Sequence, residues 1–160
     1  FKTMLIKNFL LIFIFIFFTN CGFEPIYSQK NNRFNIIVEN YEGDRTTNLK
    51  IVSKLRTHKN NNSKLYKIKI LNDYEKNDLT KDKSGKVQNY QLEFSTNFIL
   101  VSDDIKKEFT FNEKFIMKNF EDDFEEKNYE NDIKENIANL IYQKFMIQLA
   151  RIEWFIKILK

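Results

Sequence analysis

The strongest constraint on the fold is the helical pattern of the C-terminal segment. Apolar residues recur three or four positions apart there, over about seven helical turns. The stripe consists of Ile133, Ile137, Leu140, Ile141, Phe145, Leu149, Ile152, Ile156 and Leu159. A helix with one long apolar stripe has to bury it against other elements of the chain. The segment therefore predicts a long C-terminal helix that covers one face of a sheet.

Three earlier segments alternate apolar and polar residues, as expected for strands with one face in a core and the other in water. The apolar positions are Tyr66, Ile68 and Ile70 in the first segment, Tyr90, Leu92, Phe94, Phe98 and Leu100 in the second, and Phe109, Phe111, Phe115 and Met117 in the third. The polar link at residues 102–104 has no room for a helix. The last two strands are therefore expected to form an antiparallel hairpin.

A strand and a short helix are predicted ahead of these segments. In residues 34–39, Phe34, Ile36 and Val38 occupy alternate positions and form one fully apolar strand face. Gly43 ends that strand. The apolar residues at helical spacing are then Leu49, Val52 and Leu55. Asp44 or Thr46 can cap the N-terminus of this helix, because short polar side chains accept hydrogen bonds from the first free amides.

The resulting order, β-α-β-β-β-α, predicts an α+β fold. Two helices on one face of a four-stranded mixed sheet would bury both helical stripes and the aromatic strand faces in a two-layer sandwich. The chain has 160 residues, which suffices for one modest core but not for two. Residues 33–160 are therefore expected to form a single α+β domain.

The first 20 residues are typical of a lipoprotein signal peptide. Two lysines precede an unbroken apolar run over residues 9–18, which as a helix would rise about 15 Å, roughly half of a bilayer's hydrocarbon core. The only cysteine, Cys21, follows this run closely. Lipoprotein signal peptides carry at this place the cysteine that becomes the acylated N-terminus.

We therefore expect cleavage before Cys21 and acyl and diacylglycerol groups on that residue, which would hold the chain on a membrane. Residues 21–32 would then form a lipidated N-terminus and a short tether. The alternative is a plain signal peptide or signal anchor in which Cys21 is incidental. Asn20 stands where such signals usually have Gly, Ala or Ser.

The residue types offer little for catalysis. His58 is the only histidine and Cys21 the only cysteine, which excludes the usual Cys/His zinc sites. A catalytic triad would have to use His58, which lies in a basic, Asn-rich helix end. The three glycines are too isolated to cradle a phosphate. We therefore expect no enzyme activity, no metal and no cofactor, with His58 solvated at a helix end. The acidic residues at 121–130 are interpreted as capping the C-terminal helix rather than as a calcium loop.

A basic run extends from residue 45 to residue 69 and contains no acidic residue. Its members are Arg45, Lys50, Lys54, Arg56, Lys59, Lys64, Lys67 and Lys69. Such a run could bind anionic headgroups, phosphorylated saccharides or an acidic partner. The alternative is a solvated helix face and a lysine-rich edge strand that resists aggregation. Nucleic acid is not an expected partner, because loss of the leader lowers the formal charge from +4 to +2.

The stretch Cys21-Gly22-Phe23-Glu24-Pro25-Ile26-Tyr27 resembles the LptE family of lipopolysaccharide-assembly lipoproteins. Their mature chains often start with Cys-Gly-Phe-x-Pro-Leu-Tyr. The similarity continues in Asp44-Arg45 before the first helix, in the turn Lys83-Ser84-Gly85 and in the order of elements.

The resemblance implies a lipid-anchored protein on the periplasmic face of the outer membrane. Its partner would be the large LptD-like β-barrel that inserts lipopolysaccharide into the outer leaflet, with the small domain in the barrel lumen. Direct contact with lipopolysaccharide is part of this expectation, and the basic run is the candidate site. The alternatives are an envelope lipoprotein that binds peptidoglycan or a different envelope machine, and an envelope hydrolase that uses carboxylates alone.

Overall fold

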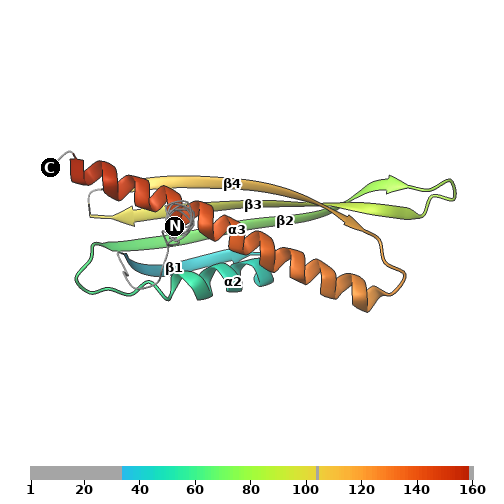
Figure 1. The fold of residues 1–160 in the computed structure, drawn as a ribbon, viewed down its shortest axis with the longest axis horizontal. Helices are drawn as coiled ribbons and strands as arrows, with labels where there is room; N and C mark the ends of the chain where they lie inside the picture. The colour runs from blue at the N-terminus through green and yellow to red at the C-terminus, as the bar shows by residue number, and fades with distance from the viewer. Residues whose placement is uncertain (1–33, 104, 159–160) are drawn as a thin grey trace, which may run out of the picture. The chain divides into compact units, whose positions relative to one another are not determined.

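The predicted order of elements is confirmed by the computed structural model, which describes residues 34–103 and 105–158 (Figure 1). The elements are β1 (Asn35–Gly43), α2 (Arg45–Leu55), β2 (Leu65–Lys81), β3 (Val87–Ser102), β4 (Ile105–Lys118) and α3 (Asp123–Ile158). The expected signal peptide, Cys21 and the tether lie outside the described residues. Among the described helices, none combines the length and the apolar character needed to cross a membrane.

The four strands form one mixed sheet in the order β1-β2-β3-β4. β1 and β2 run parallel, so α2 connects them from one end of the sheet to the other. The pairs β2–β3 and β3–β4 are antiparallel, which confirms the predicted hairpin between the last two strands. The fold is therefore the α+β arrangement that the sequence predicts.

One hydrophobic core lies between the sheet and both helices. Alternate residues of the strands enter it, as the period-2 pattern predicts. At its centre Phe145 of α3 stacks on Phe98 of β3, with the ring centroids 4.3 Å apart. Phe109 of β4 meets Phe145 edge-on. The long helix is thus held on the sheet by aromatic contacts, which add to the energy of burial.

Strand β2 is much longer than the predicted segment and forms a long antiparallel hairpin with β3. The apolar alternation of β2 fades after Ile70, but its pairing with β3 continues to Lys81. At the tip, Asp82 Oδ1 accepts hydrogen bonds from the backbone amides of Ser84 and Lys86. Both faces of the outer hairpin are exposed, so backbone hydrogen bonds form the strand there without an apolar pattern to reveal it.

The buried stripe of α2 differs from the predicted one. Leu49 is 46% exposed, whereas the buried residues are Thr47, Asn48, Ile51, Val52 and Leu55. Both sets have helical spacing, but α2 packs against α3 as well as against the sheet. Contact with α3 rotates the buried face toward Thr47 and Asn48. In α3 itself, Leu140 from the predicted stripe is 37% exposed.

Candidate functional site

The sheet face opposite the helices is open, and its side chains are mostly polar. On this face, the inner strand β3 presents Glu93, Ser95, Asn97, Ile99 and Val101. Ion pairs join neighbouring strands there: Lys114 Nζ lies 3.0 Å from Glu93 Oε1, and Lys67 Nζ lies 3.4 Å from Glu39 Oε1. The apolar side chains are scattered among polar ones, as with Leu71, which is 42% exposed. Such a face can meet water or a polar partner surface.

The basic run of the sequence is divided between two sides of this sheet. Arg45, Lys50 and Lys54 belong to α2 in the helical layer, whereas Lys67 and Lys69 of β2 alternate with buried residues and point to the open face. Arg56, Lys59 and Lys64 lie between α2 and β2. The structure therefore does not gather all eight residues into one patch.

Two of the α2 lysines contact α3. Lys50 Nζ lies 2.5 Å from Glu135 Oε2, and the ammonium group of Lys54 lies 5.3 Å from the centroid of the Tyr142 ring. Both contacts are at the surface, where ion pairs contribute little stability. They leave the ammonium groups within reach of an anion in water.

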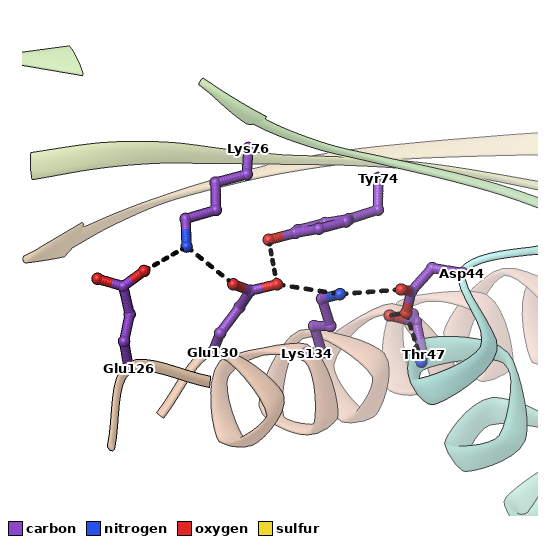
Figure 2. A network of polar contacts seen from close by, with 7 residues as sticks. All are labelled: Asp44, Thr47, Tyr74, Lys76, Glu126, Glu130 and Lys134. Carbon is purple, nitrogen blue, oxygen red and sulfur yellow. Dashed lines mark hydrogen bonds and ion pairs between the residues drawn. The ribbon is translucent and has the colours of Figure 1, made fainter. Parts of the chain in front are cut away.

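A partly buried network of polar side chains connects α2, β2 and α3 (Figure 2). Lys134 of α3 lies at its centre, 3.0 Å from Asp44 Oδ1 and 3.2 Å from Glu130 Oε1. Its ammonium group also lies 3.7 Å from the centroid of the Tyr74 ring. The Lys134 residue is only 8% exposed. This lysine therefore joins the start of α2 to the sheet and to the long helix.

The network continues from Glu130 to a second lysine. The Tyr74 hydroxyl donates to Glu130 Oε1 over 2.8 Å. Lys76 Nζ lies 3.0 Å from Glu130 Oε2 and 2.7 Å from Glu126 Oε1. Each charged group has at least one partner of opposite charge, as buried charges require.

The pKa shifts follow from these contacts. Burial by itself would raise the pKa of Glu130, but hydrogen bonds from Tyr74, Lys76 and Lys134 outweigh it and hold that pKa below its ordinary value. Burial likewise opposes the hydrogen bonds from Thr47 and Lys134 at Asp44, and the pKa of Asp44 is also lowered. The pKa of Tyr74 is raised by burial and by its bond to Glu130. These shifts favour ionised Asp44 and Glu130 and a protonated Tyr74 hydroxyl in the folded protein.

The sequence analysis missed this network. Glu126 and Glu130 were interpreted as capping groups of the C-terminal helix, but in the structure they pair with β2. The capping prediction for the acidic residues at 121–130 is confirmed at Asp122, whose Oδ1 accepts from the amides of Phe124 and Glu125. A signal was present at Lys134, a charged residue on the same helix face as buried Ala138 and Ile141. The partners of such a lysine come from distant segments, which periodicity does not reveal.

The interpretation of His58 as a solvated residue is wrong. The loop after α2 folds back on β1, where the amide of Ile36 donates to the carbonyl of His58 over 2.9 Å. The imidazole is half-buried, and its Nε2 lies 2.7 Å from the Tyr142 hydroxyl. Burial lowers the pKa of His58. The ring packs beside Phe34 and acts as a structural contact.

Within residues 34–103 and 105–158, no group of three or more His, Cys, Asp or Glu side chains is placed to hold a metal ion. In the network around Lys134, lysine ammonium groups lie between the carboxylates.

No protein-family model and no curated protein matches the sequence. Solved structures do share the fold. The rare lipoprotein B of Shewanella oneidensis has a TM-score of 0.55 at 13% sequence identity, with 74% of this chain and 99% of that chain covered. Lipoprotein B of Nitrosomonas europaea has a TM-score of 0.50 at 15% identity, with 73% and 85% covered. The fold is thus one that bacterial lipoproteins use.

Proposed function

We propose that this chain is a lipoprotein of the bacterial outer membrane, anchored on the periplasmic face through acylated Cys21. Its domain would occupy the lumen of the LptD-like β-barrel that inserts lipopolysaccharide into the outer leaflet. The observation that carries the proposal is the stretch from Cys21 to Tyr27 directly after an apolar leader. The fold shared with two bacterial lipoproteins supports it.

The surface of the domain suits this role. The open sheet face carries polar side chains and cross-strand ion pairs, and the interior of an outer-membrane barrel is polar as well. Asp44 and Glu130 have lowered pKa values and a shared lysine partner, which supports a structural role for these carboxylates. A lipid anchor would raise the local concentration of the domain near a membrane-embedded partner.

Co-purification tests the partner. Tagged protein extracted from envelope membranes in mild detergent is expected to bring down one large β-barrel protein in near-stoichiometric amount. A photocrosslinking residue at Asn112, exposed on β4 of the open face, is expected to capture the same protein. Recovery of peptidoglycan-binding or secretion components alone would contradict the proposal.

The anchor is tested by Cys21→Ser. We expect this variant to keep its leader or to leave the membrane, and to lose metabolic labelling with palmitate, because the thiol that receives the acyl groups is absent. Gly22→Ala is the matched control and should label normally, since it leaves the thiol in place. Palmitate labelling of Cys21→Ser at the normal level would show that the anchor is elsewhere.

The role of the basic run is tested by two matched charge reversals. The pair Lys54→Glu and Arg56→Glu alters the end of α2, and the pair Lys69→Glu and Lys106→Glu alters the open face by the same charge. Lys67 is left unchanged because its reversal would repel Glu39. Lys50 is left unchanged because its reversal would repel Glu135. We expect the α2 pair to weaken lipopolysaccharide binding more at low salt than at high salt, since exposed charges are screened within about 10 Å at 0.1 M salt.

Binding of the two variants is measured on immobilised lipopolysaccharide, after circular dichroism has confirmed that both fold. Equal loss in both pairs would point to net charge rather than to a site at α2. Unchanged binding of the α2 pair at both salt concentrations would assign these residues to the solvated surface.

A further inference from the structure

The C-terminal end of α3 exposes three large apolar side chains. Trp154, Phe155 and Ile158 are 65%, 63% and 60% exposed, although the same helix buries Phe145 and Leu149 completely. Residues three and four positions apart lie on one side of a helix, so Ile158 lies beside both Phe155 and Trp154. These three side chains therefore form one uncovered surface, which we call the C-terminal apolar patch.

The charges around this patch differ from those at the other end of the helix. Residues 144–160 include four basic residues and one acidic residue. The acidic one, Glu153, accepts a hydrogen bond from the Tyr66 hydroxyl over 3.2 Å, whereas Arg151 is exposed. The N-terminal half of α3 is instead strongly acidic. An exposed tryptophan and apolar neighbours flanked by basic residues are typical of a helix that lies at a lipid headgroup interface.

The patch lies at the end of the sheet where the predicted tether joins the domain. Tyr66, which contacts Glu153, pairs with Ile36 at the start of β1 and lies edge-on to Phe34, the first described residue. Figure 1 shows the end of α3 beside the end of the sheet at which β2 begins. Cys21 lies 13 residues before Phe34, so a fully extended tether keeps Phe34 within about 45 Å of the acylated cysteine.

We infer that the C-terminal apolar patch inserts into the headgroup region of the phospholipid bilayer that holds the acyl chains of Cys21. Arg151, three and four positions before Trp154 and Phe155, is exposed and would face the anionic lipids. The inference rests on the proposed acylation of Cys21. It adds a second contact with the membrane, which orients the domain with the start of β1 and the end of α3 toward the lipid. The bilayer is the surface that the tether keeps within reach, and its anionic headgroups match the basic excess of the segment.

Trp154 is the only tryptophan in the sequence, so its fluorescence reports directly on the patch. The test uses purified full-length lipoprotein in vesicles of phosphatidylethanolamine and phosphatidylglycerol with brominated acyl chains. We expect the emission of Trp154 to shift to the blue and bromine to quench it at least about twofold, because interfacial tryptophan lies at the depth of the upper acyl chains. Emission that is quenched only by aqueous acrylamide would overturn the inference. Protection from both quenchers would also overturn it, since protein would then cover the patch.

Two variants separate insertion from mere proximity to the membrane. Phe155→Ser with Ile158→Ser keeps the reporter but removes most of the apolar surface around it, and we expect bromine quenching to fall to the level of a solvated tryptophan. The matched control is Phe124→Ser, which removes a side chain that is 72% exposed at the opposite end of α3. This control should leave the quenching unchanged.

Separate assays distinguish this inference from the proposed function. Palmitate labelling and recovery of the barrel report on the anchor and the partner, whereas Trp154 reports on the patch alone. Labelled, barrel-associated protein whose Trp154 remains in water would reject the patch and leave the proposed function in place. Absence of label on Cys21 would reject the anchor on which the inference rests.

Discussion

Lys134→Met is expected to lower the free energy of unfolding by about 3 kcal/mol, the lower end of the range for removing one partner of a buried ion pair. The side chains of Lys134, Asp44 and Glu130 are 11%, 14% and 17% exposed. Methionine fills a similar volume but supplies no charge, so both carboxylates lose a partner. The contact of the ammonium group with the Tyr74 ring is lost as well. Urea unfolding followed by circular dichroism measures the effect.

The matched control is Lys50→Met. Lys50 also joins α2 to α3, through Glu135, but its side chain is 34% exposed and that of Glu135 is 49% exposed. We expect a loss of less than about 1 kcal/mol, because water screens an exposed pair. Equal effects of the two substitutions would show that the buried network contributes no more than a surface contact.

The pH dependence of the Lys134→Met effect provides an independent check. The pKa values of Asp44 and Glu130 are lowered in the folded protein, so their stabilising contribution is present at neutral pH and is lost as the pH falls through those lowered values. Without Lys134 the lowering is smaller. The difference in stability between the two proteins should therefore be largest near neutral pH and should shrink below about pH 4.

Gly43→Ala is expected to cost about 3 kcal/mol of stability, from a strained backbone and a steric clash together. Gly43 has a φ angle of +101°, and a Cβ atom added there would lie 1.5 Å from the carbonyl oxygen of Asn72 in β2. Because that oxygen belongs to the backbone of the paired strand, β1 and β2 would have to separate locally. The melting temperature and the urea midpoint of the variant measure the loss.

Gly85→Ala separates the two causes of this loss. Gly85 has a φ angle of +86°, but a Cβ atom there would have no neighbour within 4 Å. We expect this variant to lose only about 1 kcal/mol, the cost of a left-handed conformation in a residue with a side chain. If both alanine variants lost the same free energy of unfolding, the close approach of Gly43 to Asn72 would contribute nothing to the loss.

Lys134→Met is also expected to affect the proposed membrane contact. Lys134 fixes α3 against the sheet, and the C-terminal apolar patch is carried by the same helix. A destabilised network would let α3 move relative to β1. This variant is therefore best compared with the patch variants at a temperature at which all of them remain folded.

Much of the fold follows from local patterns. The alternation of residues 90–100 and 109–117 and the helical period after residue 130 each reflect one buried face of one element. The cap at Asp44, one of two candidates, is likewise a local interaction, since its Oδ2 accepts from the amide of Thr47 three residues away. The signal peptide and the acylation of Cys21 were also inferred locally, and they remain predictions.

The surfaces of the candidate site follow less directly from local patterns. The basic run is continuous in the sequence, but the turn from α2 into β2 places Lys54 and Lys67 on opposite sides of the sheet. The C-terminal apolar patch could not be recognised, because Ile156 and Leu159 of the predicted stripe have the same apolar character as exposed Ile158. Which side chains of that segment are exposed depends on where the sheet beneath α3 ends.

Periodicity and capping residues alone specified the order of six elements, the α+β class and the long C-terminal helix, because each depends on neighbours within one segment. The partners of Lys134, the rotation of α2 that exposes Leu49 and the extension of β2 to Lys81 depend on contacts between distant segments. Their energies come from burial and pairing across the interior. Those contacts exist only once the helices have packed on the sheet.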